Sequence, residues 1–447
     1  MKNNYELSDI FPSVNNNCEV QTLLDTDMYK VMMLDFILSN PEYKNLVVAW
    51  KMTVRSKDVK TAEIIPEEEL IEQLEMTKKL PGISDEEFNF LENHTLPNGD
   101  KALQNSTLEF LQTNPLCDYT VEKTNDWNYD LEFTGTWADS MLWEIFGLKI
   151  INSLYLKNYI LKDNLSSPEV SKIINSTLDR LYNDIEIFKK SPDLRFSEFG
   201  SRRALSAPFQ KKVYDILRQE IPNQCVWTSN IHLSRLSGTK PIGTNAHELR
   251  MIPTALYDNP QKIIDTMYDI DRKWQEHFPS LWIILPDTYG TSFYYDNCPQ
   301  DIIKNHNGTR FDSKDPMEAI PEYVDWLLKN NQNPQEKAWI PSDWLNSRNA
   351  SEIQETHHDS VGNLSFWIGT NLSNNTKGIY PRKEEHGPFG SFSVVIKPAR
   401  VQRPDGTWVS CVKLSDNPEK AVWDSDRVQF FKEIFWANWV KSQEVLV

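Results

Sequence analysis

The pattern of hydrophobic and polar positions divides the chain into two kinds of sequence. Up to about residue 190, long amphipathic stretches alternate with short apolar ones, which is typical of mixed helices and strands. The elements predicted there are a helix over 26–38 capped by Asp25 or Thr26, a strand over 45–56, helices within 65–82 and 166–192, and a hairpin within 119–137. Residues 391–416 predict a second hairpin, which turns around Pro404-Asp405-Gly406-Thr407 and precedes a Trp-rich helix.

From about residue 195 the pattern changes to short apolar runs that end abruptly in polar or Gly-containing turns. Most of these runs are followed by a helical stretch, which favours parallel βα units. Seven such runs favour a barrel over a short open sheet. The runs are RFSEFG (195–200), QCVWTSN (224–230), PIGTNAHE (241–248), SLWIILPDTYG (280–290), TRFDS (309–313), AWIPSD (338–343) and LSFWIGTN (364–371).

Each of the seven runs ends in residues able to carry chemistry. A parallel barrel brings the carboxyl ends of all its strands to one face, so these side chains are predicted to meet at one mouth. The alternative is that polar residues merely end the strands. The residues concerned are Glu198 and Arg202, Ser229 and Asn230, His247 and Glu248, Asp287, Arg310 and Asp312, Asp343, and Thr370 and Asn371.

Length and charge narrow the class of protein. A chain of 447 residues is long enough for two domains, or for one large barrel with an appendage. A net charge of -17 argues against nucleic acid or an anionic membrane as the main partner. The N-terminus lacks an apolar signal core, no run of 18 apolar residues occurs, and the five cysteines form no CxxC pair. These features predict a cytoplasmic protein without a metal or disulfide framework.

Nine motifs carry a resemblance to a known family. They are LLDTDMYK (23–30), GTWADSMLWEI (135–145), FSEFGSRRALS (196–206), TSNIHLSRLSGTKPIGTNAHE (228–248), LPDTYGT (285–291), TRFDSKDP (309–316), SDWLN (342–346), FWIGTNLSNN (366–375) and VKLSDNPEK (412–420). In this order and spacing, the chain resembles the nicotinate phosphoribosyltransferases, which are type II phosphoribosyltransferases. The resemblance implies an α/β fold with an irregular (βα) barrel over 136–372. A mixed α+β domain would be built from both chain ends, 1–135 and 373–447.

The resemblance also implies an activity and a set of binding residues. The expected reaction is ATP-coupled transfer of phosphoribosyl from phosphoribosyl pyrophosphate to nicotinate, a ligase-class step of NAD salvage that uses Mg²⁺. Arg202 and Arg310 would hold phosphates or the nicotinate carboxylate through their planar guanidinium groups. Asp312 and Asp343 would accept from ribose hydroxyls or lie on the Mg²⁺ side. Gly369 and Thr370 would grip the 5′-phosphate through backbone N–H groups.

Two aromatic residues are expected to enclose the pyridine ring. Phe199 and Tyr29 match the family's ring plates, although Phe199 alone would suit an ordinary core position. In the resembling enzymes the tyrosine comes from the neighbouring subunit, which implies a homodimer with shared active sites.

His247 is the residue on which ATP coupling would depend. The matching histidine of the family is phosphorylated by ATP, and a neutral imidazole is a suitable nucleophile for a phosphoryl group. Glu248 is expected to orient the ring and Asp312 to assist catalysis. Without the resemblance, a histidine before a helix would more simply be a cap or a core residue. No GxxxxGK(S/T) or GxGxxG motif occurs, so ATP would bind in another way.

Three departures from the family motifs leave alternatives open. Phe311 replaces a histidine or glutamine, and Lys314 and Trp367 replace glycines, with Lys314 a possible further phosphate contact. A nicotinamide-using relative is one alternative, although Ser229 stands where those enzymes carry an acid. A catalytically silent binding protein is another. The fifteen tryptophans and the acidity also suggest a carbohydrate enzyme with sugar-stacking side chains.

Overall fold

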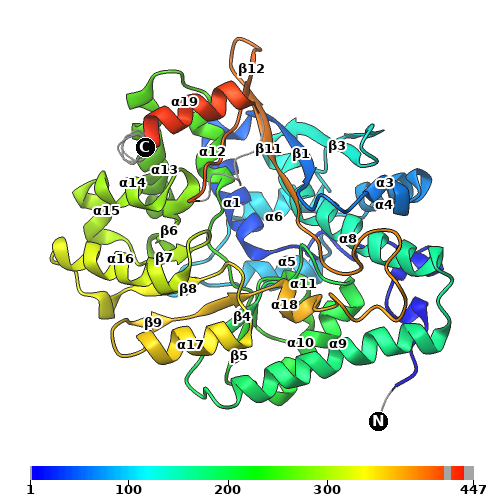
Figure 1. The fold of residues 1–447 in the computed structure, drawn as a ribbon. Helices are drawn as coiled ribbons and strands as arrows, with labels where there is room; N and C mark the ends of the chain where they lie inside the picture. The colour runs from blue at the N-terminus through cyan, green and yellow to red at the C-terminus, as the bar shows by residue number, and fades with distance from the viewer. Residues whose placement is uncertain (1–2, 417–423, 437–447) are drawn as a thin grey trace, which may run out of the picture.

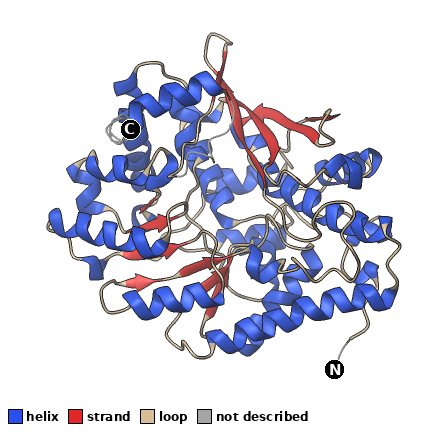
Figure 2. Cartoon of the chain, viewed as in Figure 1, coloured by secondary structure: helices blue, strands red, loops and turns tan. Residues whose placement is uncertain are grey.

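An antiparallel sheet and a parallel barrel occupy different parts of the molecule, and helices surround both (Figure 1; Figure 2). The computed structural model describes residues 3–416 and 424–436. The α/β class predicted from the sequence is confirmed.

The antiparallel sheet joins the two ends of the chain. Its strand order is β12-β11-β1-β3-β2, and Val48 in the middle strand pairs with Val401 near the C-terminus. Three strands come from the first 136 residues and two from beyond residue 393. This sheet therefore confirms a mixed part built from both chain ends, while the boundaries at 135 and 372 stay a prediction. The strands are β1 (Val47–Val54), β2 (Tyr119–Lys123), β3 (Tyr129–Thr136), β11 (Val394–Gln402) and β12 (Trp408–Ser410).

The helices before the barrel follow the predicted pattern with one shift. The first predicted helix begins at Met28 rather than at residue 26, because Asp25 and Asp27 bind Lys149 and Ser229 with their side chains. These helices are α1 (Met28–Ser39), α2 (Pro41–Lys44), α3 (Thr61–Ile64), α4 (Glu67–Lys78), α5 (Asp85–Glu92), α6 (Asn105–Gln112), α7 (Trp137–Ser140), α8 (Trp143–Lys162) and α9 (Ser167–Phe188). Two short 3-10 helices, Leu7–Asp9 and Pro12–Asn15, precede them.

Six of the seven predicted runs form parallel strands, in two sheets ordered β10-β4-β5 and β6-β7-β8-β9. The last run joins the sheets, because the Ser365 amide bonds to Trp339 of β8 while the Phe366 amide bonds to Arg195, just before β4. The strands are β4 (Phe196–Glu198), β5 (Cys225–Thr228), β6 (Ile283–Ile284), β7 (Gly308–Phe311), β8 (Ala338–Pro341), β9 (Asn363–Leu364) and β10 (Phe366–Ile368).

The remaining run, 241–248, closes the barrel without becoming a regular strand. It makes one bridge, Thr228 to Pro241, and its Asn245 side chain donates to the carbonyl of Ile283 in β6. Pro241 has no N–H to continue a ladder. Gly243 passes so close to α1 that a Cβ would lie 2.4 Å from the Tyr29 nitrogen. The prediction of a strand here is therefore only partly met.

Helices follow every barrel strand except β9. They are α10 (Ala207–Glu220), α11 (Ile231–Leu236), α12 (Glu248–Ala255), α13 (Pro260–His277), α14 (Thr291–Asp296), α15 (Gln300–Asn305), α16 (Pro316–Lys329), α17 (Ser347–His357) and α18 (Thr370–Ser373). Helices α15, α16 and α17 lie on the outer side of the strands (Figure 1). The predicted C-terminal helix is α19 (Ser425–Phe435), and residues 437–447 lie outside the described part. Three short 3-10 helices are Pro279–Leu281, Pro286–Thr288 and Pro334–Glu336.

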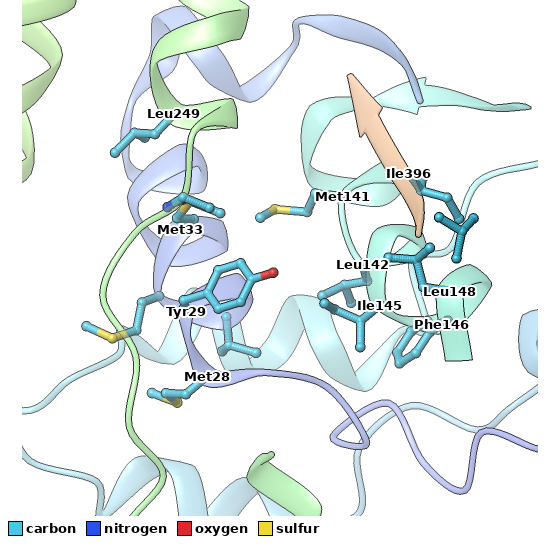
Figure 3. Close-up of a cluster of buried hydrophobic side chains, with 14 of the residues drawn as sticks. Met28, Tyr29, Met33, Met141, Leu142, Ile145, Phe146, Leu148, Leu249 and Ile396 are labelled. Carbon is cyan, nitrogen blue, oxygen red and sulfur yellow. Dashed lines mark hydrogen bonds between the residues drawn. The ribbon is translucent and has the colours of Figure 1, made fainter. Parts of the chain in front are cut away.

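Helix α1 is the element that fastens the mixed part to the barrel. Tyr29 and Met33 project from it toward Met141 and Leu142, which precede α8 (Figure 3). All four side chains are buried in the main core. Because α1 is anchored in this core, the residues at its N-terminal end are held rigidly against the barrel mouth.

Candidate active site

His247 lies at the mouth of the barrel, immediately before α12, and partners hold both of its ring nitrogens. Nδ1 lies 3.0 Å from Thr288 Oγ1, and Nε2 lies 2.8 Å from Asp312 Oδ2. The Lys413 ammonium is also 2.8 Å from Nε2. Burial lowers the pKa of His247 to about 4. The imidazole is therefore neutral at physiological pH, and one ring nitrogen keeps a lone pair.

Two carboxylates face this histidine. Asp287 Oδ2 lies 3.7 Å from His247 Nε2, and neither oxygen of this buried carboxylate has a hydrogen-bond partner within the described chain. Burial opposes ionisation of Asp312, but Arg310 and His247 outweigh it and hold the pKa of Asp312 well below its usual value. The donor atoms of His247, Asp287 and Asp312 all lie within 4.8 Å of one another. Carboxylate oxygens are ligands that Mg²⁺ prefers, so Asp287 and Asp312 could hold a divalent cation.

A segment from the far end of the chain completes this side of the site. The Thr288 carbonyl accepts the amides of Leu414 and Ser415, which places Lys413 beside the histidine. Asp416 accepts hydrogen bonds from Thr291 and from Ser313. Sequence reasoning recognised this motif but assigned no role to its lysine, because no local pattern relates it to a histidine 166 residues away. Residues 417–420 of the motif lie outside the described part.

On the opposite side, the start of α1 contacts the ends of β4 and β5. Ser229 donates a 2.6 Å hydrogen bond to Asp27, and the Met28 amide donates to the Ser229 carbonyl. Burial raises the pKa of Asp27, while Arg202 acts in the opposite direction. Tyr29 is only 4% exposed, and its hydroxyl is in the electrostatic field of Glu144 and Arg202 of the same chain. Its ring is enclosed by its own chain, whereas the resemblance implied a role in a neighbouring subunit.

Glu248 does not contact the imidazole. Its carboxylate binds Lys30 of α1 at 2.5 Å, and the same ammonium lies 2.6 Å from Glu144. Lys397 of β11 binds Glu144 from the other side at 2.5 Å. The expectation that Glu248 orients His247 is therefore not met, because the buried lysine takes its carboxylate and Thr288 and Asp312 orient the ring.

Phe199 and Arg310 meet on a third side chain, Trp367. The rings of Phe199 and Trp367 stack with centroids 4.2 Å apart and planes 12° from parallel. The Arg310 guanidinium carbon lies 5.4 Å from the centre of the Trp367 ring, and Arg310 also donates to the Asn245 carbonyl at 2.9 Å. The predicted ring plate and one predicted anion-binding group are thus brought together.

The remaining predicted residues follow β8 and β10. Asp343 lies within electrostatic reach of Arg55 and Arg203. A Cβ at Gly369 would lie 2.7 Å from the Phe199 carbonyl oxygen, so this close approach requires glycine. Thr370 begins the four-residue helix α18. The barrel therefore gathers these residues at its mouth, while their individual roles stay predictions.

Comparison with known proteins identifies the family. A model of the nicotinate phosphoribosyltransferase family matches residues 194–437, and a model of that family's N-terminal domain matches residues 24–152. The chain belongs to the nicotinate phosphoribosyltransferase family. Membership places it among enzymes that transfer a phosphoribosyl group to nicotinate in NAD salvage, and it excludes the carbohydrate alternative.

Solved structures of nicotinate phosphoribosyltransferases share the fold. The one from Porphyromonas gingivalis has a TM-score of 0.77 at 24% identity, covering 93% of this chain and 99% of that one. The one from Vibrio cholerae has a TM-score of 0.76 at 24% identity, with coverage of 96% and 95%. The one from Saccharomyces cerevisiae has a TM-score of 0.74 at 23% identity, with coverage of 94% and 98%. At these identities the likeness shows the fold alone.

Two departures from the family motifs have clear packing roles here. Phe311 is buried and stacks on Trp339 with centroids 6.0 Å apart. Lys314 forms a 2.7 Å ion pair with Glu322, so its ammonium is engaged within the chain. Within residues 3–416 and 424–436, no helix is long and apolar enough to cross a membrane.

Proposed function

We propose that this chain joins nicotinate to the ribose of phosphoribosyl pyrophosphate and drives the reaction by ATP-dependent phosphorylation of His247. In the transfer, the pyridine nitrogen bonds to the anomeric carbon as the bond from that carbon to pyrophosphate breaks. The observation that carries the ATP coupling is the buried neutral His247, which is held between Thr288, Asp312 and Lys413. A histidine that served only as a helix cap would not need a cation and two carboxylates beside it.

The geometry supports Nε2 of His247 as the nucleophile. In the tautomer with the proton on Nδ1, the Nδ1–H donates to Thr288 and the Nε2 lone pair accepts from Lys413. The hydrogen bond from Nε2 to the Asp312 carboxylate belongs to the other tautomer and is absent when Nε2 is the nucleophile. This nitrogen attacks the γ-phosphorus, and the bond to the ADP oxygen breaks. Lys413 offsets negative charge on the transferred phosphoryl group. Water later cleaves the P–N bond, which releases phosphate and restores the imidazole.

Mg²⁺ is part of the proposal, and Asp287 and Asp312 are the residues that would hold it. The fit rests on the Asp287 carboxylate, which is 2% exposed and has no hydrogen-bond partner on either oxygen within the described residues. When bound, the ion would neutralise charge on the pyrophosphate. Asp312 also binds His247, so the same carboxylate would take part both in phosphoribosyl transfer and in phosphorylation of the histidine.

The other predicted residues divide into binding roles. Phe199 would carry the pyridine ring on its open side, with Arg310 and Arg202 facing the carboxylate or phosphates. Ser229 would lie beside the nicotinate, Asp343 would accept from ribose hydroxyls or lie on the Mg²⁺ side, and the Gly369-Thr370 turn would receive the 5′-phosphate. Because Asp27 bonds to Ser229 and Tyr29 lies in the electrostatic field of Arg202 within the same chain, their positions support a site that one chain completes.

Labelling with γ-labelled ATP and Mg²⁺ tests the coupling. The wild type should acquire an acid-labile, base-stable phosphate, as expected of phosphohistidine. His247→Asn should abolish labelling and ATP hydrolysis, while slow ATP-independent transfer persists because the ribose and pyridine contacts are unchanged. His306→Asn is the matched control, since His306 is also buried and neutral but bonds to Tyr323.

The outcomes separate the remaining alternatives. Full ATP stimulation in His247→Asn would show that His247 is structural. Mononucleotide formed from nicotinamide as readily as from nicotinate would favour the nicotinamide-using reading. If neither nicotinate nor nicotinamide yields mononucleotide, the result would favour a catalytically silent homologue with a binding role.

A further inference from the structure

Trp367 separates the mouth of the barrel from a cavity inside it. The side chain is 3% exposed and forms a small apolar cluster with Ile283 and Ile340, apart from the main core. These three residues also line a cavity of about 890 Å³, which extends to Arg195 and His358 at the opposite end of the barrel. Parallel barrels usually fill their interior with several layers of side chains. Here this cluster lies between the catalytic mouth and a hollow interior.

Packing alone sets the position of the Trp367 ring. Its indole N–H is buried and has no hydrogen-bond partner within the described residues. Besides Ile283 and Ile340, the ring contacts Phe199, with ring centroids 4.2 Å apart, and the Arg310 guanidinium carbon, which lies 5.4 Å from the ring centre. Conversely, Phe199 and Arg310 each rest on the same indole. Moving or removing Trp367 would therefore shift both groups together.

We infer that Trp367 determines how far the carboxylate of the acceptor can lie from its pyridine ring. Its indole packs beneath both Phe199, which would stack on the ring, and Arg310, which would bind the carboxylate. The inference rests on the proposed function, in which Phe199 carries the pyridine ring and Arg310 its carboxylate. With both groups backed by one rigid indole, the distance between ring and carboxylate is set to that of a pyridine-3-carboxylate. A longer acid would need the volume that Trp367 occupies.

The Trp367 indole fills the space between Ile283 of β6 and Ile340 of β8. A small residue here would connect the mouth with the cavity of about 890 Å³. Trp367 thus separates the mouth of the barrel from this cavity.

The test uses Trp367→Ala and Trp367→Phe in the full-length enzyme. The probe is trans-3-(pyridin-3-yl)acrylate, which keeps the pyridine and the carboxylate but separates them by two more carbons. In Trp367→Ala, the KM for nicotinate should rise about tenfold or more, because stacking and cation–π support are lost. The KM for phosphoribosyl pyrophosphate should stay within about threefold. Trp367→Phe keeps an aromatic floor and should recover much of the affinity for nicotinate that Trp367→Ala loses. Trp408→Ala is the matched control, because Trp408 is a partly exposed residue of β12 that packs on Arg400, and it should leave both KM values unchanged.

Isothermal titration calorimetry measures the affinity for the longer acid without depending on catalytic turnover. The longer acid should bind Trp367→Ala at least about tenfold more tightly than the wild type, since the vacated volume admits it. If Trp367→Ala does not fold, Trp367→Leu replaces it and should show the same changes at smaller size. An unchanged KM for nicotinate, a rise confined to phosphoribosyl pyrophosphate, or no gain for the longer acid would each overturn the inference. If the wild type makes no mononucleotide, the proposed function fails, while the binding comparison still tests Trp367.

Discussion

Ser229 at the end of β5 donates a 2.6 Å hydrogen bond to Asp27 at the start of α1, so one chain brings an acid from its N-terminal part onto its own barrel mouth. The Met28 amide strengthens the same junction through the Ser229 carbonyl. Tyr29 follows directly and lies in the field of Arg202. The two halves of the candidate site are therefore joined within a single chain.

Mixing two inactive variants tests whether one chain completes the site. Tyr29→Leu and Arg202→Ala should each lower kcat/KM strongly, because each removes a group from the same mouth. Mixed at equal amounts, the two should show no recovery, since each chain would still lack one group. Recovery to as much as half of wild-type activity, together with mixed dimers detected by native mass spectrometry, would place Tyr29 in the partner's site.

Substrate choice should favour nicotinate over nicotinamide. Arg202 and Arg310 offer cations to a carboxylate, and leaving a buried charge without its partner costs about 2–5 kcal/mol, or about 30-fold and upward in kcat/KM. Steady-state kinetics with both acceptors should show this gap. Arg310→Gln should narrow it, whereas Arg272→Gln should not, because Arg272 pairs with Asp301 and Asp269 on the surface. Equal kcat/KM values would instead assign the unpaired oxygen of Asp27 to a carboxamide N–H.

Phosphorylation of His247 should persist well below neutral pH. Burial lowers the pKa of this imidazole to about 4, so the nucleophilic neutral form dominates down to about pH 5. The rate of labelling by γ-labelled ATP, measured between pH 8 and 4, should be limited by His247 ionisation only near the lower end. The same shift makes the folded state bind fewer protons than the unfolded state between about pH 6.5 and 4, so stability falls as the pH falls through that window. A labelling midpoint near 6.5 would show that the imidazole is solvated.

The buried ion pairs around Glu144 should contribute strongly to stability. Burial opposes ionisation of Glu144, but Lys30 and Lys397 outweigh it and hold its pKa below the usual value. Glu144→Gln leaves two buried ammonium groups short of a counter-charge and should lower the free energy of unfolding by about 3–5 kcal/mol. Urea unfolding at pH 7 measures this change. Glu63→Gln is the control, because the Lys60–Glu63 pair spans 3.6 Å at the surface and should change stability by less than about 1 kcal/mol.

The ion pairs of Glu144 also determine how the stability of the protein changes at acidic pH. Glu144 has a lowered pKa in the folded state, so its contribution is complete above the unfolded value of about 4.3 and declines as the pH falls below it. Wild-type stability should therefore decrease more steeply below pH 4 than that of Glu144→Gln. Parallel curves for the two proteins would contradict this role.

Elements with a strong local pattern were predictable from the sequence. The helix over Glu67–Lys78 has acids in its first turn, Lys78 in its last and Pro66 as its N-cap. The seven barrel runs were also predictable, because short apolar stretches that end in turns need no distant partner to be recognised. The run beginning at Pro241 was less predictable, since its irregular path depends on how closely Gly243 approaches α1.

The candidate site was only partly predictable for a related reason. Motifs placed His247, Arg310 and Asp312 at strand ends, and the barrel brings them together. The partner of Glu248 could not be read in the same way, because Lys30 lies 218 positions earlier in the chain. Neither could the position of Lys413, which reaches His247 only after the C-terminal segment returns to the barrel.

The sequence by itself determined the order of βα units and the family motifs, because alternation, turns and short motifs act over a few residues. The sheet built from both chain ends was expected only from the resemblance, since the pairing of Val48 with Val401 joins distant segments. The tertiary structure alone decided that Lys30 takes Glu248, that Lys413 reaches His247, that Asp27 lies on Ser229 and that Trp367 supports Phe199 and Arg310. Each of these contacts joins segments far apart in the chain. Which buried charge meets which partner, and which rings stack, is fixed only when the packed core brings those segments together.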